Sequence, residues 1–206
     1  MIIRKIALLL VVVLTGFAAT AQTATTWTVD PAHSAITFKI KHMGLTFVPG
    51  EFDKFTGTMT ASNADFSDAK ISFTADVNSI NTGITKRDDH LRSADFFEVE
   101  KYPEIKFVST SFTKATKPTN NKSKADKQND FYELKGNLTI KDVTKPVTFK
   151  VIYGGKVVDQ QGNPKIGFTA KSDINRLDYN VKYDPTGQGV AKDVDIVIYL
   201  EMAPKK

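Results

Sequence analysis

The sequence predicts an all-β protein, an extended eight-stranded antiparallel β-barrel with a short helix near residues 85–93. Two observations predict the barrel. Eight separate stretches alternate apolar and polar residues with a period of two, which is typical of strands with one buried face. In five of these stretches the apolar face also carries very small side chains. An eight-stranded closed sheet has an interior that is either just filled by side chains or just able to hold one small ligand.

The predicted strands follow one another along the chain. In residues 36–40, Ile36, Phe38 and Ile40 share one face, and threonine and lysine occupy the other. The other stretches are residues 55–59, 71–77, 105–111, 132–140, 147–153, 166–170 and 194–200. Between the third and fourth stretches the period changes, and Thr85 is expected to cap a helix whose first turn carries Asp88 and Asp89, because acidic side chains suit the positive end of a helix.

The two faces of these strands indicate which kind of barrel they form. Aromatic residues lie in the middle of the strands among other apolar residues, and lysines and threonines lie on the opposite face. A membrane barrel would instead carry aromatic girdles at both ends of its strands and a polar lumen. The pattern therefore favours a lipocalin-like barrel, polar outside and apolar inside.

Residues 1–21 are expected to be a cleaved signal peptide. Arg4 and Lys5 precede an apolar run at residues 6–14, and residues 19–21 read Ala-Thr-Ala, the small-x-small pattern that precedes cleavage. The apolar run is short for a membrane span. We therefore expect an exported protein, periplasmic or secreted, in which residues 22–206 form a single β-barrel domain. The absence of cysteine from the sequence excludes disulfides and thioether lipidation.

The formal net charge of +5 is unevenly distributed. Residues 114–130 contain five lysines against Asp126 and Asp130, and they are predicted to form a mobile lysine-rich loop between two strands. Contact of this loop with anionic lipid headgroups is an alternative to a simple solvated loop. Because the rest of the chain has no predicted basic face, we expect no nucleic-acid partner.

Catalytic and metal-binding patterns are weak. His33 and His42 lie at opposite ends of one predicted strand, too far apart to share a metal ion, and no metal site is expected. Residues 87–90, Arg-Asp-Asp-His, place four ionisable side chains in one helical turn, but neighbouring helix positions do not face each other. Helix contacts explain them without acid–base chemistry, and we expect no enzyme. His42, Arg87 and His90 remain candidate contacts for a ligand headgroup.

The apolar lumen is the main candidate site. Inward-facing phenylalanines could plug the barrel, whereas the small residues Gly57, Ala75, Ser109, Ser111, Gly136 and Ala170 favour an open slot. A dry apolar slot suits a long hydrocarbon tail, because every buried carbon is withdrawn from water. Strand alternation predicts the following lumen residues: Phe38, Ile40, Phe55, Gly57, Met59, Phe73, Ala75, Phe107, Ser109, Leu134, Gly136, Leu138, Phe149, Val151, Phe168, Ala170, Ile196 and Ile198.

Several motifs of the chain resemble the YceI family, in order and across residues 26–203. They lie at residues 27–34, 40–44, 50–57, 87–97, 101–107, 136–140 and 144–147. The resemblance implies a lipocalin-like barrel that binds a polyisoprenoid or related long-chain amphiphile in its lumen and has no established catalytic activity. Two features depart from the family. Leu177 and Asn180 stand where the family often has serine and glycine, and residues 114–130 resemble an insertion.

The leading hypothesis is therefore an exported lipid-binding protein that stores or transports a polyisoprenoid, a quinone or a similar amphiphile. Two alternatives stay open: an enzyme that acts on an isoprenoid headgroup through Arg87, Asp88 or His90, and a stress-related structural module with a filled barrel. No cofactor is expected apart from a bound lipid. The partners considered are this lipid, a peripheral membrane contact and a second copy in a homodimer.

Overall fold

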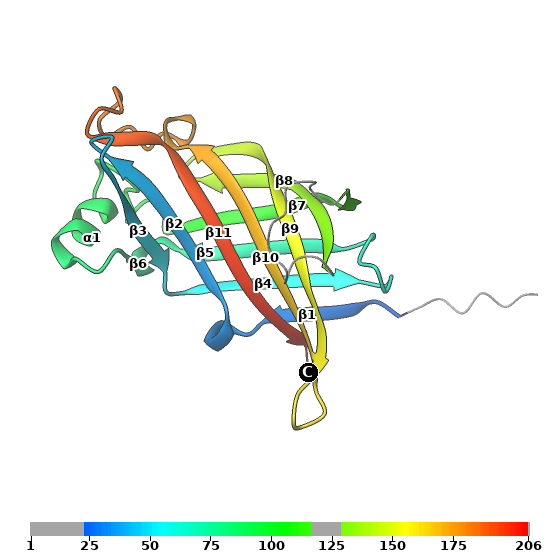
Figure 1. Ribbon diagram of the computed structural model, residues 1–206. Coiled ribbons are helices and arrows are strands. Elements are labelled where there is room, and N and C mark those ends of the chain that lie inside the picture. The colour runs from blue at the N-terminus through cyan, green and yellow to red at the C-terminus, as the bar shows by residue number, and fades with distance from the viewer. Residues whose placement is uncertain (1–22, 117–128, 206) are drawn as a thin grey trace, which may run out of the picture.

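The computed structural model describes residues 23–116 and 129–205, which form a closed antiparallel barrel (Figure 1). The first three barrel strands are each interrupted once. They consist of β1 (Thr25–Val29) and β2 (Ala35–His42) around η1 (Pro31–His33), β3 (Thr46–Phe52) and β4 (Phe55–Ala61) around residues 53–54, and β5 (Lys70–Asp76) and β6 (Ile80–Asn81) around η2 (Val77–Ser79). Five uninterrupted strands follow: β7 (Glu104–Ala115), β8 (Asp130–Ile140), β9 (Val143–Val158), β10 (Pro164–Asn175) and β11 (Val190–Pro204).

Strand pairing confirms the predicted eight-stranded barrel. Each strand pairs with its neighbour in the chain, and β1 and β2 both pair with β11, which closes the ring. Seven of the eight predicted stretches lie wholly within strands, and the eighth, residues 71–77, extends one residue past β5 into η2. The prediction missed β1, β3 and β6, because β3 contains Pro49 and Gly50 and β6 has only two residues, which conceals their alternation.

The two ends of the barrel differ. At the end we call the cap end, at the upper left of Figure 1, lie the β2–β3 hairpin, the helix α1 (Thr85–Arg92) and residues 176–189, which include η4 (Arg176–Tyr179). The opposite end carries the β4–β5 loop, the β9–β10 hairpin and the C-terminal end of β11. Different connections between strands therefore cover the two ends of the lumen.

Helix α1 forms where it was predicted and ends one residue earlier, at Arg92. The predicted cap was wrong: Thr85 is the first helical residue, and Ile84, whose side chain cannot accept a hydrogen bond, holds the N-cap position. Asp88 orders this end instead. Its buried Oδ1 accepts hydrogen bonds from the N–H of Thr82 at 2.9 Å and from the hydroxyl of Thr82 at 2.5 Å. This fixes the helix to the segment that follows β6.

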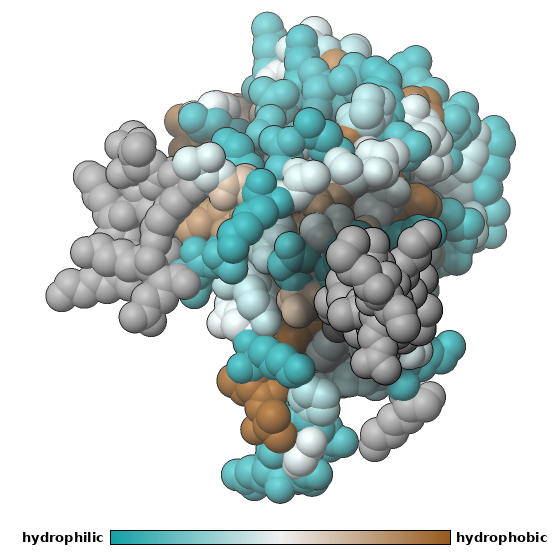
Figure 2. All heavy atoms as spheres, turned by 90° about the vertical axis from the view of Figure 1, so that its right-hand side faces the viewer, coloured by the Kyte–Doolittle hydropathy of each residue, from teal (hydrophilic) through white to brown (hydrophobic). Residues whose placement is uncertain are grey.

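The outer surface is largely hydrophilic, as the alternation predicts. Figure 2 shows one face in teal and white, with a brown patch at its lower end, at the height of the β9–β10 hairpin. Val157 and Val158 of that hairpin are each 65% exposed. Most large apolar side chains instead point into the barrel and form its core.

Aromatic side chains fill the half of the barrel opposite the cap end. We call this cluster the aromatic plug; it consists of Phe66, Phe112, Tyr132, Tyr153 and Phe168. Phe112 stacks on Tyr132 with ring centroids 4.6 Å apart. Phe66 comes from the β4–β5 loop at a positive φ of 59°, and its ring lies 5.7 Å from that of Phe168. This loop folds back and closes the lumen at the end opposite the cap end.

A β-bulge in β7 corrects the prediction for two small residues. The register with β8 shifts between Ser109 and Ser111, so Phe112 rather than Ser111 faces the aromatic plug. The hydroxyl of Ser109 accepts the N–H of Ile71 at 2.8 Å and thereby takes the place of a missing ladder bond. The bulge reverses which residues point inward from Ser111 onward. Ser109 precedes the bulge, and its hydroxyl is engaged with the backbone of β5.

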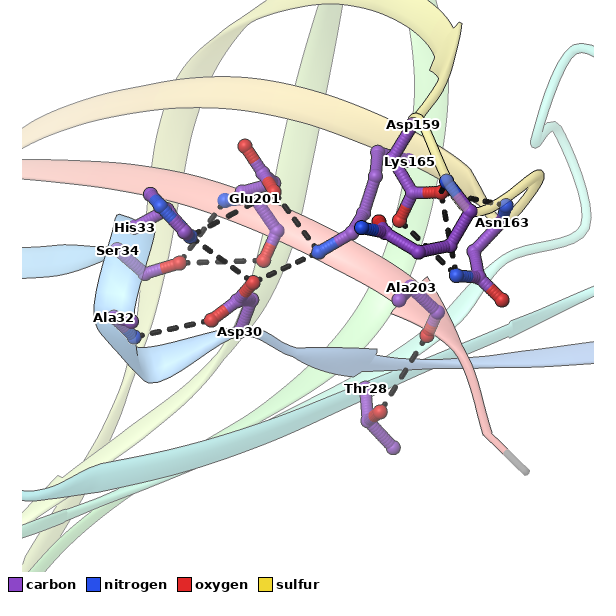
Figure 3. Close-up of polar contacts among 11 residues, drawn as sticks. Thr28, Asp30, Ala32, His33, Ser34, Asp159, Asn163, Lys165, Glu201 and Ala203 are labelled. Atoms are coloured by element: carbon purple, nitrogen blue, oxygen red, sulfur yellow. Dashed lines mark hydrogen bonds and ion pairs between the residues drawn. The ribbon is translucent and has the colours of Figure 1, made fainter.

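Charged side chains join the strands where the barrel closes (Figure 3). Lys165 on β10 donates to Asp30, which follows β1, at 2.8 Å, and lies 3.0 Å from Glu201 on β11. His33 Nδ1 lies 3.1 Å from Asp30. Asp30, His33 and Glu201 are residue types that bind metal ions and lie close together. The ammonium group of Lys165 already supplies a cation to both carboxylates.

The predicted lysine-rich loop is bounded more tightly than expected. Lys114 and Ala115 belong to β7 and Asp130 to β8, and Lys114 pairs with Asp130 at 2.9 Å. The middle of the loop, residues 117–128, and the expected signal peptide lie outside the described residues. Among the residues that are described, no helix has the length and apolar character needed to cross a membrane.

Candidate functional site

A cavity of about 190 Å³ lies between the cap end and the aromatic plug. Its wall is formed almost entirely by apolar side chains of β2, β5, β7, β8, β9, β10 and β11. Leu91, Phe96 and Phe97 close it on the side of α1, and Tyr179 and Val181 close it on the side of η4. The barrel is thus neither fully open nor fully filled: one half holds a packed core and the other a cavity.

Many of the predicted lumen residues line this cavity: Phe38, Ile40, Phe73, Ala75, Phe107, Leu134, Leu138, Phe149, Ala170, Ile196 and Ile198. Others point inward but lie elsewhere. Met59, Val151 and Phe168 are buried in the main core, and Phe55 packs beside Phe52 and Ile80. These four residues lie outside the cavity wall, because strand alternation indicates which face a residue occupies, not its depth along the barrel axis.

The glycines predicted to leave open volume are covered by neighbouring rings. A Cβ atom at Gly57 would lie 2.2 Å from the ring of Phe73, and one at Gly136 would lie 2.4 Å from the ring of Phe107. Gly50, which was not predicted, is covered in the same way, because a Cβ atom there would lie 2.4 Å from the ring of Phe38. Each ring occupies the space that a side chain would take. These glycines therefore create room indirectly, because they allow three cavity-lining rings to pack against the sheet.

Arg176 is a buried charged residue of the cavity wall, 4% exposed. A guanidinium group has five N–H donors, and here all five bonds run to backbone carbonyls of the cap end. Nε donates to Ala191 at 2.8 Å; Nη1 donates to Val181 at 2.8 Å and Tyr183 at 2.5 Å; Nη2 donates to Asp184 and Val190, both at 2.8 Å. Burial lowers the pKa of Arg176, although an arginine stays charged in a protein.

Asp184 completes the organisation of this segment. Its carboxylate accepts the N–H groups of Gly189 at 2.7 Å and Val190 at 2.8 Å, and the hydroxyl of Thr186 at 2.6 Å. These hydrogen bonds hold the pKa of Asp184 well below its ordinary value. Residues 176–190 are therefore fixed by their own polar groups, and the cavity ends at a buried positive charge whose donors are already engaged.

The three predicted headgroup contacts lie away from the cavity wall, and all three are in the described part of the chain. His42 is exposed at the end of β2. Arg87 Nε donates to the hydroxyl of Thr82 at 2.7 Å. His90 Nε2 lies 2.8 Å from Asp95 Oδ2. The prediction missed Arg176, since no sequence pattern distinguishes a buried arginine from a surface one at the end of a strand.

The ionisable turn at residues 87–90 is held by structural contacts. Asp89 pairs with Arg92 at 2.8 Å, three residues further along the helix, and Arg92 Nε donates to the carbonyl of Asn78 at 3.0 Å. The ring of His90 packs edge-on against the rings of Phe96 and Tyr183, with centroids 5.1 Å and 5.0 Å away, and those two rings also contact each other. These contacts attach α1 to η2 and to residues 176–189, as the helix interpretation predicts.

The departure from the family at Asn180 has a conformational explanation. Asn180 ends η4 in the left-handed conformation, with φ 58° and ψ 21°. Glycine adopts this conformation without strain, and asparagine tolerates it better than most other residues. The side chain of Asn180 also donates to Asp142 at 3.0 Å. Asparagine can therefore occupy this position, where the resemblance led us to expect glycine, with little strain.

A family model described as the YceI-like domain matches residues 27–202, which include nearly every described strand. The chain belongs to the YceI-like family. Protein YceI of Escherichia coli O6:H1 is 34% identical over 194 residues, covering 92% of this chain and 93% of that protein. The resemblance derived from the motifs is confirmed.

Solved structures support the same fold for this YceI-like chain. The crystal structure of BcnA from Burkholderia cenocepacia matches with a TM-score of 0.69 at 24% identity, covering 84% of this chain and 98% of that one. A polyisoprenoid binding domain from Saccharophagus degradans matches with a TM-score of 0.64 at 15% identity, covering 88% and 99%. Both likenesses concern the fold.

Proposed function

We propose that this YceI-like protein binds one long-chain amphiphile, a polyisoprenoid or an isoprenoid quinone, with its tail in the cavity. The observation that carries the proposal is a cavity walled by apolar side chains whose charged residue, Arg176, has all its donors engaged. Such a wall favours hydrocarbon and offers little to a polar ligand. The shared fold with a domain described as polyisoprenoid binding supports the choice of lipid class.

The size of the hydrophobic gain indicates what the protein does with its lipid. Each five-carbon isoprene unit withdrawn from water gains roughly 3–4 kcal/mol. Over several units this gain would exceed any realistic affinity, so the competitor for the lipid is a membrane rather than water. The proposed role is therefore storage or transport. We propose no catalysis, because Arg87, Asp88 and His90 are bonded within their own segments.

We further propose that the protein acts outside the cytoplasm after removal of residues 1–21. Support comes from the charged, apolar and small-residue sections of this segment in the sequence. The intact mass of protein purified from its native host should correspond to a chain that begins at Gln22. A mass that includes residues 1–21 would contradict cleavage.

Filling the cavity tests the lipid proposal. Ala170 is 5% exposed and lines the cavity, so Ala170→Phe should place a ring where the tail lies. We expect mass spectrometry of an organic extract to find an isoprenoid lipid in the parent protein and a lost or shortened one in the variant. The cost in unfolding free energy should be below about 1 kcal/mol, because the added volume enters a void.

A matched control lies in the packed half of the barrel. Ala61 is equally buried, at 6% exposure, within the main core. Ala61→Phe should cost about 1–3 kcal/mol or more through overpacking, and lipid should be retained in the fraction that folds. Equal destabilisation by both substitutions, with no lipid in the parent protein, would contradict the proposal and favour a filled structural barrel.

A further inference from the structure

The tip of the β2–β3 hairpin, residues 41–47, exposes large apolar side chains at the cap end. Leu45 is 83% exposed, Met43 is 59% exposed and Phe47 is 48% exposed. Large apolar side chains that are adjacent and this exposed commonly mark an interaction site. The tip is therefore a candidate binding surface beside the cavity.

The conformation of the turn does not explain why large apolar residues occupy it. Met43 and Gly44 both have positive φ, 49° and 69°, and the N–H of Leu45 donates to the carbonyl of His42 at 2.9 Å. Positive φ at both central residues is typical of a type I′ turn, in which asparagine, aspartate or glycine is preferred at the first of them. Methionine at this position has a strained backbone and an exposed side chain. This combination does not stabilise the fold and therefore indicates a functional role.

Two lysines of β2 lie behind the tip. Residues 35–50 contain Lys39 and Lys41 and no acidic residue. The Nζ atoms of these lysines lie 4.4 Å and 6.0 Å from the ring centroid of Phe47, and Lys39 also pairs with Asp195 at 3.2 Å. Apolar side chains at a tip with lysines behind them match a bilayer, whose hydrocarbon lies beneath its anionic headgroups.

The tip is joined directly to the cavity. The N–H of Met43 donates to the carbonyl of Gly189 at 2.8 Å, and His42 is the strand partner of Val190. Val190 lines the cavity, as does Ile40, two residues before His42. A surface bound by the tip would therefore lie close to the cavity wall.

We propose that the hairpin tip docks the protein on an anionic lipid bilayer, with Met43 and Leu45 in the interface and Lys39 and Lys41 at the headgroups. This inference rests on the proposed lipid-binding function and names the surface from which the cavity is loaded. Docking in this orientation turns the cap end toward the bilayer, so a tail can move between membrane and cavity with little exposure to water.

Vesicle binding by the full chain tests the proposal. The probes are vesicles of phosphatidylethanolamine and phosphatidylglycerol, with binding measured by co-sedimentation. The double variant Met43→Asn/Leu45→Ser should bind at least about tenfold more weakly, because two apolar side chains no longer leave water. Its melting temperature should be equal or higher, because asparagine suits the left-handed turn position. Lys41→Gln should weaken binding to these vesicles and have no effect with phosphatidylcholine vesicles.

The β9–β10 hairpin supplies a matched control at the opposite end. Val157→Thr/Val158→Thr removes two apolar side chains that are each 65% exposed, and vesicle binding should be unchanged. Unchanged binding by the Met43/Leu45 variant, or equal loss in both double variants, would overturn the proposal. So would a dimer in analytical ultracentrifugation that only the Met43/Leu45 variant dissociates, since the tip would then contact a second copy.

Failure of docking and failure of lipid binding can be distinguished. Ala170→Phe should keep vesicle binding and lose lipid uptake, whereas the Met43/Leu45 variant should keep the lipid already bound and take up new lipid slowly. Tip-dependent vesicle binding without any lipid in the cavity would retain the docking surface and contradict the lipid function. Bound lipid together with vesicle binding that does not depend on the tip would retain the lipid function and contradict the docking surface.

Discussion

Glycines decide where the aromatic rings of the cavity lie. Gly57 is the strand partner of Phe73, and the ring covers the glycine so closely that even a methyl group would collide with it. The ring of Phe107 on β7 covers Gly136 on β8 as closely, although the strand partner of Gly136 is Ser109. A strand normally gains stability from side chains, so a glycine inside it costs stability unless another group needs its space. Here that group is a ring that would otherwise project into the cavity.

Gly57→Ala should force the ring of Phe73 away from the sheet. We expect a loss of about 1–3 kcal/mol in unfolding free energy from overpacking, together with less bound lipid. Denaturant unfolding and lipid extraction measure the two effects. Combining Gly57→Ala with Phe73→Leu should recover part of the stability, because the smaller side chain leaves room for the methyl group.

Gly167 on β10 provides the control. The nearest described neighbour of a Cβ atom there would be the carbonyl oxygen of Leu200, at 3.8 Å. Gly167→Ala should therefore be neutral or should stabilise the protein by up to about 1 kcal/mol, since alanine restricts the unfolded chain more than glycine does. A similar loss for both substitutions would mean that the ring contact at Gly57 is unimportant.

At the scale of elements, the segment that includes η4 depends on one side chain. Arg176 gathers carbonyls from both sides of this segment, and Asp184 closes it with two backbone N–H bonds. The segment has little regular structure of its own, so these bonds replace the ladder or helix bonds that would otherwise satisfy its backbone. The cavity wall at this end therefore depends on a buried polar network.

Arg176→Met should leave several buried carbonyls without partners. We expect a loss on the order of 3 kcal/mol in unfolding free energy, because each orphaned group costs about 1–3 kcal/mol and water can replace some of the bonds. Amide hydrogen exchange at residues 181–191 should also become faster. Lys182→Met, an exposed position in the same segment, should change stability by less than about 0.5 kcal/mol. Unchanged exchange in Arg176→Met would contradict the role given to the guanidinium group.

At the scale of the whole molecule, one half of the barrel lumen stabilises the fold and the other half provides the cavity. The aromatic plug and the buried side chains around it supply a packed core, which allows the other half to keep a cavity. The barrel also needs closure, and Asp30, Lys165 and Glu201 link β1, β10 and β11 where the first and last strands meet (Figure 3). Loss of this link should lower the free energy of unfolding of the whole barrel.

The closure network predicts a dependence of stability on pH. Bonds from Lys165 and His33 lower the pKa of Asp30 from 3.8 to about 2. A carboxyl group with a lowered folded-state pKa contributes stability above its unfolded pKa and loses it as pH falls. Asp30→Asn should therefore be less stable than the parent protein by about 1–2 kcal/mol near neutral pH, and the difference should shrink between about pH 4 and pH 2.

Urea unfolding of both proteins across this pH range measures the effect. Asp195→Asn is the control, because Asp195 pairs with Lys39 on the surface and exposed ion pairs contribute little. A constant difference between the parent protein and Asp30→Asn from neutral pH down to about pH 2 would show that the carboxylate charge of Asp30 is not what stabilises the closure.

The sequence predicted the barrel and much of the cavity wall, and its errors share a physical cause. Ile196 and Phe168 both alternate correctly, yet one lines the cavity and the other lies in the aromatic plug. Ser109 follows the alternation until a bulge interrupts it. Alternation is a local property of a strand, whereas depth and bulges depend on the neighbouring strand.

The sequence by itself determined the number of barrel strands, the face that each one buries, the short helix and the family. Local periodicity carries the first three, because a strand with one buried face must alternate wherever it pairs. Only the tertiary structure decided which half of the lumen is filled. That outcome depends on Phe66 folding back from a loop, on rings that cover glycines of adjacent strands, and on Arg176 reaching carbonyls up to 15 residues away. These contacts join segments that no local pattern relates.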